Sequence, residues 1–329
     1  MHLRTVLSAA ALLGIVGTLF AAAPGIPPTT ARGRGGAAGR GRGGAPAAQA
    51  QTPNAAEVAR VEAALPDKAP AAPAKPRKVL AFGKATAFVH NTIPLGAKTI
   101  ELLGTKTHAY ETTISFDAAM MDSEKLKEFD AIALVSTTGS FLDDPNNAEV
   151  TAKRRKALLD FVNDGKGIVG IHAASDAYYD WPEYGQMMGG YFSRHTSGFE
   201  KVLLKLDDPT NPINAAFEGK PFETADEIYR FVTPPSNRNA KQTYSRERVR
   251  VLLSVDVSKY NNEPAGTDMP ISWVHPQGKG RVFYCELAHN ASVMATPALL
   301  KHYLAGVQYA IGDLKVNDTP TPATQSAGN

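Results

Sequence analysis

Residues 167–172 are Gly-Ile-Val-Gly-Ile-His, and the polar and aromatic stretch Ala-Ala-Ser-Asp-Ala-Tyr-Tyr-Asp-Trp-Pro-Glu-Tyr follows at residues 173–184. A short apolar run that stops at a histidine is typical of a buried parallel strand that brings a side chain to its carboxyl end. In open α/β sheets that edge is where ligands bind. His172 is therefore the first candidate for a functional residue.

Strand and helix patterns alternate before this run. Residues 78–82 and 130–136 predict buried strands, and residues 108–115 predict a weaker one. Residues 92–105 and 146–163 have apolar side chains at helical spacing, which predicts helices between these strands. The alternation favours an α/β fold with a mostly parallel sheet and helices on both faces.

The second half of the chain is less regular, and it shows no convincing domain boundary. We expect residues 78–315 to form a single domain, followed by a disordered polar tail at residues 316–329. Further strands are predicted at residues 201–206, 248–257, 270–273 and 281–287, and a closing amphipathic helix at residues 296–311.

The N-terminus has the pattern of an export signal. A basic start at residues 1–4 precedes the almost wholly apolar or small residues 6–23, and Ala-x-Ala sequences lie at residues 21–23 and 48–50. We expect residues 1–23 to be a signal peptide, with cleavage as late as residue 50 as an alternative. The product would then be periplasmic or secreted, without a membrane association. The apolar run is also nearly long enough to span a bilayer, so an uncleaved anchor is the other alternative.

Residues 24–77 are a low-complexity leader and linker, rich in Gly, Arg, Ala and Pro, with one short helix expected at residues 55–65. The Arg-Gly repeats of residues 32–44 resemble RNA-binding segments, but the charge of the folded part argues against that partner. Residues 1–77 hold nine of the 35 Lys/Arg and three of the 32 Asp/Glu, which leaves 26 basic and 29 acidic residues. Without a basic surplus, the folded part is not expected to bind nucleic acid.

Several polar side chains follow predicted strands. His90, His172 and His289 come at or after strand ends, and His195 and Glu227 lie in connections. Imidazoles are the usual acid/base and metal-binding groups, and carboxylates are their usual partners. The chain has no H-E-x-x-H and no closely spaced Cys/His set. Spacing alone therefore leaves two interpretations open, a shared polar pocket or scattered histidines with ordinary hydrogen bonds.

Aromatic residues lie near the same strand ends. Trp181, Tyr184 and Trp273 could stack on sugar rings, although such rings fill a core equally well. Arg281 could bind a carboxylate, but a structural ion pair is the commoner use of such an arginine.

Together these segments resemble the ThuA-like (trehalose utilisation) family, over about residues 78–312. The resemblance implies a variant of the class I glutamine amidotransferase fold, with a flavodoxin-like sheet. One departure is Ala288, where the family usually has glycine. The segments that carry the resemblance are, in order, Phe88-x-His90, Gly170-Ile-His172-x-x-x-Asp176, Trp181-Pro-Glu-Tyr184-Gly, Gly190-Tyr-Phe-x-x-His195, Asp226-Glu-x-Tyr229, Pro270-Ile-Ser-Trp273 and Gly278-Lys-Gly-Arg281-Val-Phe-Tyr284-x-x-Leu-x-His289.

The true amidotransferases have a nucleophilic cysteine at a Gly-x-Cys turn, and the comparable residue here is His172. The only cysteine, Cys285, lies in a different predicted strand, so no disulfide can form within the chain and a thioester route is not expected. We therefore do not expect glutamine amidotransferase activity.

The resemblance implies involvement with a disaccharide or its 3-keto derivative. Together with the export signal, it leads us to expect an exported enzyme that acts on such a sugar by acid/base chemistry, in an isomerisation, elimination or hydrolysis. The expected catalytic groups are His172, Glu227 and His289. A divalent metal bound by His90, His172, His195 and His289 is a further expectation. The alternative is a non-catalytic sugar-binding protein that uses the same pocket, and the oligomeric state, including a homo-oligomer, stays open. The expected substrate-binding residues are His90, Asp176, Trp181, Tyr184, His195, Trp273 and Arg281.

Overall fold

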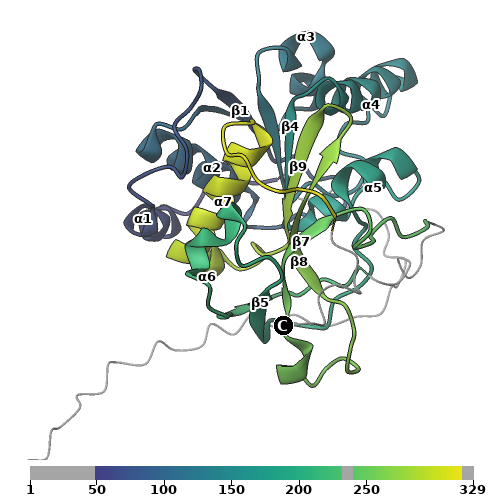
Figure 1. Ribbon diagram of the computed structural model, residues 1–329. Helices are drawn as coiled ribbons and strands as arrows, with labels where there is room; N and C mark the ends of the chain where they lie inside the picture. The colour runs from purple at the N-terminus through teal and green to yellow at the C-terminus, as the bar shows by residue number, and fades with distance from the viewer. Residues whose placement is uncertain (1–48, 232–239, 321–329) are drawn as a thin grey trace, which may run out of the picture. The chain divides into compact units, whose positions relative to one another are not determined.

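The structure is a computed structural model that describes residues 49–231 and 240–320 (Figure 1). The expected signal peptide, residues 24–48 of the expected leader and residues 321–329 of the expected tail lie outside the described residues. Within the described ranges, no helix has both the length and the apolar character needed to cross a bilayer.

A single nine-stranded sheet organises the described part of the chain, in the order β2-β1-β3-β4-β9-β8-β7-β5-β6. The strands are β1 (Lys78–Phe82), β2 (Glu111–Ser115), β3 (Ala131–Val135), β4 (Gly167–Ile171), β5 (Glu200–Leu206), β6 (Phe222–Asp226), β7 (Arg250–Val255), β8 (Pro270–Gln277) and β9 (Gly280–Cys285). The helices are α1 (Ala55–Ala64), α2 (Ile93–Thr107), α3 (Ser123–Leu126), α4 (Ala148–Asn163), α5 (Pro182–Met188), α6 (Ala291–Met294) and α7 (Pro297–Ala310), with short 3₁₀ turns η1 (Ala118–Met121), η2 (His172–Ser175), η3 (Pro212–Phe217) and η4 (Val257–Lys259).

The first five strands in spatial order, β2 to β9, pair in parallel, and the remaining pairings are antiparallel. Only β8 and β5 therefore run against the other strands. This confirms the predicted α/β class with a mostly parallel sheet. The carboxyl ends of β1, β4 and β9 lie at one edge, which is the edge where the parallel strands deliver their following residues.

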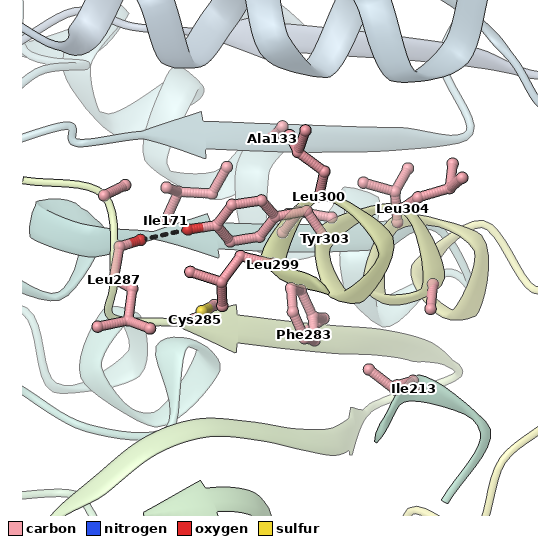
Figure 2. Packing of buried hydrophobic residues seen from close by; sticks show 14 of the residues in the cluster. Ala133, Ile171, Ile213, Phe283, Cys285, Leu287, Leu299, Leu300, Tyr303 and Leu304 are labelled. Atoms are coloured by element: carbon pink, nitrogen blue, oxygen red, sulfur yellow. Dashed lines mark hydrogen bonds between the residues drawn. The ribbon is translucent and has the colours of Figure 1, made fainter. Parts of the chain in front are cut away.

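Helices cover both faces of the sheet because successive strand side chains point to opposite sides. In β1, Val79 and Ala81 pack in one core cluster with α2 and α7, whereas Leu80 and Phe82 pack in the other with α4 and α5. Figure 1 shows the two helical layers on either side of the central strands. In Figure 2, the Tyr303 hydroxyl donates to the backbone oxygen of Leu287, at a distance of 2.6 Å, and so ties α7 to the end of β9.

Several predicted boundaries are corrected by the structure. The second strand begins at Glu111 rather than at residue 108, because His108 adopts a left-handed conformation (φ 55°) that ends α2. The structure also contains α5 and β6, which were not predicted, since α5 has only seven residues and one face of β6 is exposed.

The segment before β1 packs on the domain. The short helix expected near residues 55–65 is present as α1, and its Val61 is fully buried in the core that contains α2 and α7. Gln308 in α7 binds both the backbone nitrogen and the backbone oxygen of Ala71. At the other end of the chain, the Tyr309 hydroxyl donates to Asp318, so residues on both sides of the central domain contact α7.

Candidate functional site

His172 stands on a sharp turn between β4 and η2. Its backbone has φ 48°, a left-handed conformation that is uncommon for a residue with a side chain. The Tyr284 hydroxyl holds this turn in place, because it donates a hydrogen bond of 2.7 Å to the backbone oxygen of His172. Two residues earlier, a Cβ at Gly170 would lie 2.4 Å from the sulfur of Met188, so only glycine fits there. Close packing below the strand end therefore fixes the direction of the imidazole.

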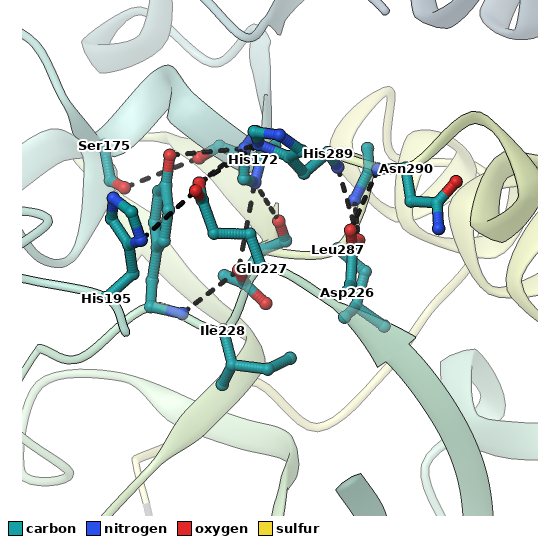
Figure 3. A network of polar contacts seen from close by, with 12 residues as sticks. His172, Ser175, His195, Asp226, Glu227, Ile228, Leu287, His289 and Asn290 are labelled. Atoms are coloured by element: carbon teal, nitrogen blue, oxygen red, sulfur yellow. Dashed lines mark hydrogen bonds and ion pairs between the residues drawn. The ribbon is translucent and has the colours of Figure 1, made fainter. Parts of the chain in front are cut away.

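Three side chains converge on Nε2 of this histidine, and Figure 3 shows one of them, His289, beside His172 and Glu227. His90 Nε2, His289 Nδ1 and the Tyr229 hydroxyl each lie 3.2 Å from His172 Nε2. The Glu227 carboxylate lies 3.7 Å from the same atom. The structure thus brings together residues from four separate parts of the sequence, as the shared-pocket interpretation requires.

The hydrogen bond at Nδ1 indicates which nitrogen of His172 carries the proton. His172 Nδ1 donates to the backbone oxygen of Glu286 at 2.7 Å, which leaves an unprotonated lone pair on Nε2. Burial lowers the pKa of His172 well below its usual value, and the neighbouring His90 and His289 lower it further. Burial, with the charge of His289, also lowers the pKa of His90 to about 4. Both rings are therefore neutral near pH 7.

Glu227 joins the outer histidines. Its Oε2 lies 3.1 Å from His289 Nδ1, and its Oε1 lies 3.2 Å from His195 Nδ1. Burial opposes ionisation of Glu227, but the hydrogen bond and the charge of His289 outweigh it, so the pKa of the carboxyl is lowered. The same pairing raises the pKa of His289 although burial acts to lower it. Glu227 is therefore an anion in contact with two imidazoles.

Two buried carboxyl groups that sequence analysis did not assign support these residues. Asp226 accepts hydrogen bonds from the backbone nitrogens of Ala288, His289 and Asn290, which fixes the loop that presents His289. Glu286 accepts from the backbone nitrogen of Tyr229, and burial raises its pKa well above the usual range. A lone glutamate inside the apolar run of residues 282–288 was the available signal for Glu286, since an isolated buried carboxyl needs a specific reason.

Tyr229 was also not assigned by sequence analysis, although it belongs to the Asp226-Glu-x-Tyr229 segment. Burial raises its pKa well above the usual value, and the charges of Glu227 and Asp176 add to the shift, so the phenol keeps its proton. Asp176 is half-buried and accepts a hydrogen bond from Tyr179. It therefore borders the site electrostatically without joining the cluster of imidazoles.

The structure places Trp273 and Tyr184, which were expected to bind substrate, in the core. Trp273 is fully buried, stacks on Tyr284 with 4.2 Å between ring centroids, and donates to the backbone oxygen of Met188. The Tyr184 hydroxyl donates to the backbone oxygen of Ala174, in the turn that follows His172. Tyr184 therefore supports the His172 turn directly, and Trp273 packs on Tyr284, which bonds to the backbone of His172.

Arg281 and Trp181 also lie away from the cluster. Arg281 is paired with Gly167, at the opposite end of β4 from His172, and its Nε donates to the last backbone oxygens of α7. This is a structural role, which the sequence had left open. Trp181 is half-buried and packs with Tyr178 beneath the guanidinium of Arg155.

The ligand atoms of His90, His172, Glu227 and His289 all lie within 4.8 Å of one another. Nitrogens that share a tetrahedral ion at 2.0–2.1 Å are about 3.3 Å apart, which is close to the 3.2 Å separations found here. The hydrogen bond from His172 Nδ1 to a backbone oxygen is the outer contact that metal-binding histidines usually make. His90 Nδ1 is buried with no partner among the described residues. His195, expected among the metal ligands, lies outside this group; among the four clustered residues it pairs with Glu227.

The nucleophilic cysteine of the class I glutamine amidotransferases has no counterpart at this site. Cys285 is fully buried in β9, and burial raises the pKa of its thiol. An imidazole occupies the turn where a nucleophile would stand.

Comparisons with known proteins agree with this architecture. Residues 78–310 match the model of the ThuA family, described as trehalose utilisation. A search of curated proteins finds no match. A ThuA-like protein from Bacteroides uniformis is 21% identical, with a TM-score of 0.56 over 81% of this chain and 95% of that one. A ThuA-like protein from Parabacteroides merdae is 16% identical, with a TM-score of 0.50 over 76% and 96%. These two structures support the fold.

Proposed function

This chain belongs to the ThuA trehalose-utilisation family, and we propose that it is an enzyme that processes a disaccharide or its 3-keto derivative. One observation carries the proposal. Three imidazoles and one carboxylate come together at the carboxyl ends of the parallel strands, with their ligand atoms within 4.8 Å of one another. We assign His90, His172, Glu227 and His289 as ligands of a divalent cation. Three nitrogens and one carboxylate suit Zn, Mn, Fe, Co or Ni.

The same geometry supports His195 as the acid/base residue. Its Nδ1 lies 2.5 Å from the backbone oxygen of Thr196 and 3.2 Å from Glu227. Both neighbours are acceptors, so the proton belongs on Nδ1 and Nε2 carries a lone pair. The His195 side chain is 38% exposed, so this nitrogen is accessible to a substrate. His195 thereby takes the acid/base role that the sequence suggested for His172 and Glu227.

The reaction of a keto sugar requires few groups beyond these. The keto group acidifies the neighbouring C–H bond, so a positioned base can remove that proton and begin an isomerisation or an elimination. A bound divalent cation would polarise the oxygen on which negative charge develops. Tyr229, with its proton retained, is placed to donate a hydrogen bond beside His172. Because Cys285 is buried away from the turn, a thioester mechanism has no nucleophile here.

We also propose that the protein is exported, with residues 1–23 as its signal peptide and a periplasmic or secreted product. The support is the sequence pattern of a basic start and an apolar run.

The decisive variants for the activity are His172→Asn and the matched His108→Asn. Both histidines have positive φ, at 48° and 55°, and asparagine tolerates that conformation. With 3-keto-trehalose as substrate, His172→Asn should lower kcat/KM by at least about 100-fold, because the cation that would polarise the substrate loses a ligand. His108→Asn, remote from the cluster, should turn over like the parent.

An unchanged kcat/KM in a folded His172→Asn protein would remove this residue from the mechanism. A parent protein that binds the sugar without turnover would instead identify the non-catalytic sugar-binding alternative.

A further inference from the structure

A cavity of about 470 Å³ lies beside the proposed catalytic residues. Its volume falls within the ~300–1,000 Å³ typical of small-molecule sites. Its lining includes the loop after β9, with His289 and Asn290, and the start of α1, with Asn54 and Glu57. Asn91 and Phe199 complete the lining that the argument uses. The segment before β1, expected to be a linker, thus forms part of a cavity that reaches a member of the cluster.

The exposed aromatic side chains of the described chain are placed at this same edge. The large apolar residues that stay exposed there are Phe88, at 62%, and Phe199, at 57%. Each lies edge-on to a histidine of the cluster, Phe88 to His90 at 4.7 Å and Phe199 to His289 at 5.8 Å between centroids. A single exposed phenylalanine needs no explanation. Two that flank one polar cluster have the arrangement of rings that pack against the apolar faces of a sugar.

The polar lining suits hydroxyl groups. Asn54 and Asn290 use their Oδ1 atoms to cap α1 and α6, so the Nδ2 groups are the parts of these side chains left to donate to a ligand. Glu57 is half-buried in the cavity wall and supplies acceptor oxygens. Amide donors and a carboxylate acceptor around one aromatic ring are the groups that bind a neutral polyol. The described lining includes no lysine or arginine, and its one imidazole, His289, is paired with the Glu227 carboxylate, so an anionic ligand is disfavoured.

We propose that this cavity is the subsite for the second, non-reacting ring of a disaccharide. The inference rests on the proposed function, and it takes the reacting ring to lie against Glu227 and His195. Phe199 then covers one face of the second ring, and Asn54, Asn91 and Asn290 bind its hydroxyl groups. The subsite makes the protein selective for disaccharides over monosaccharides.

The test compares the dissociation constants of trehalose and glucose by calorimetry on the full-length protein. The variants are Asn54→Ser, Asn290→Ser and Phe199→Ala. Serine caps a helix about as well as asparagine, so the first two changes remove the amide donor and keep the cap. Asn147→Ser is the matched control, because Asn147 caps α4, which packs on the other face of the sheet.

We expect the parent to prefer trehalose by about ten-fold or more, and each variant to reduce that preference by about two- to ten-fold, the effect of one lost hydrogen bond or ring contact. The affinity for glucose should stay within about two-fold, and Phe199→Trp should keep the preference. Variants that leave the ratio unchanged, or weaken both sugars equally, overturn the subsite.

Equal or absent binding of the two sugars by the parent also overturns it. Because unreactive sugars are used, this result is independent of the turnover test on His172→Asn, so the two proposals can fail separately.

Discussion

Of the six described non-glycine residues whose backbone has a positive φ, two lie at the histidine cluster. His172 has φ 48° and Ala288 has φ 147°. Strained backbone of this kind costs of order 1–3 kcal/mol and persists where the surrounding packing determines it. At His172 the turn directs an imidazole into the site. At Ala288 the turn places the next residue, His289, within 3.2 Å of His172.

Ala288→Gly is expected to stabilise the protein. The family usually has glycine at this position, and glycine adopts φ 147° without steric cost. The gain from relieved strain should exceed the loss of one buried methyl group and leave about 1 kcal/mol of net stabilisation. The measurement is the free energy of unfolding by urea denaturation.

Ala131→Gly is the matched control, because Ala131 is equally buried in β3 and does not have a positive φ. That variant should lose about 1 kcal/mol. A loss of stability in Ala288→Gly of the same size as in the control would show that the conformation at Ala288 carries no strain.

The connection that follows β6 places Glu227 and Tyr229, and Arg230 anchors it. The Arg230 side chain is fully buried and binds Glu200 of β5 at 2.6 Å and Glu263 at 2.7 Å. Burial opposes ionisation of both carboxyl groups, but hydrogen bonds from arginine outweigh it and lower their pKa values. These ion pairs therefore attach the segment that carries Glu227 and Tyr229 to the antiparallel part of the sheet.

This network predicts an acid-dependent part of the stability. A lowered folded-state pKa stabilises the fold above the usual glutamate pKa of 4.5, and that contribution is lost as the pH falls through the folded value. Arg230→Met should cost about 3–5 kcal/mol at pH 7, because the carboxylates of Glu200 and Glu263 lose their buried arginine. The difference between parent and variant should shrink as the pH falls below about 4.5.

Urea denaturation over a series of pH values measures this difference. Arg194→Met is the control, since Arg194 also pairs with Glu263 but its side chain is 44% exposed. Its cost should be below about 1 kcal/mol. A difference for Arg230→Met that does not change with pH would contradict the assigned charge states.

At the scale of the molecule, β1, β3 and β4 were predictable because they are short apolar runs that are buried almost throughout. The residues of β3 and β4 are all buried, and the apolar patterns located both strands. The strand β6 was missed because its exposed face interrupts the apolar pattern, and α5 because it has fewer than three turns.

The site was partly predictable for the same reason. Histidines at strand ends could be identified as candidates, since parallel strands share a carboxyl edge. Their mutual distances depend on turns and loops, as do the parts played by Asp226 and Glu286, so these could not be inferred from spacing. Residue type alone could not distinguish Trp273, which packs in the core, from Phe199, which lines the cavity, because both are aromatic. Nor did composition show that Asn54 and Glu57 border the site.

The central claim is that His90, His172, Glu227 and His289 hold one divalent cation. It is tested most directly by elemental mass spectrometry of the full-length protein, purified without chelator or histidine tag and equilibrated with Zn, Mn, Fe, Co or Ni. We predict about one equivalent of one of these metals in the parent and in His108→Asn, and a large loss in His172→Asn. A folded parent protein that retains none of these metals would contradict the claim.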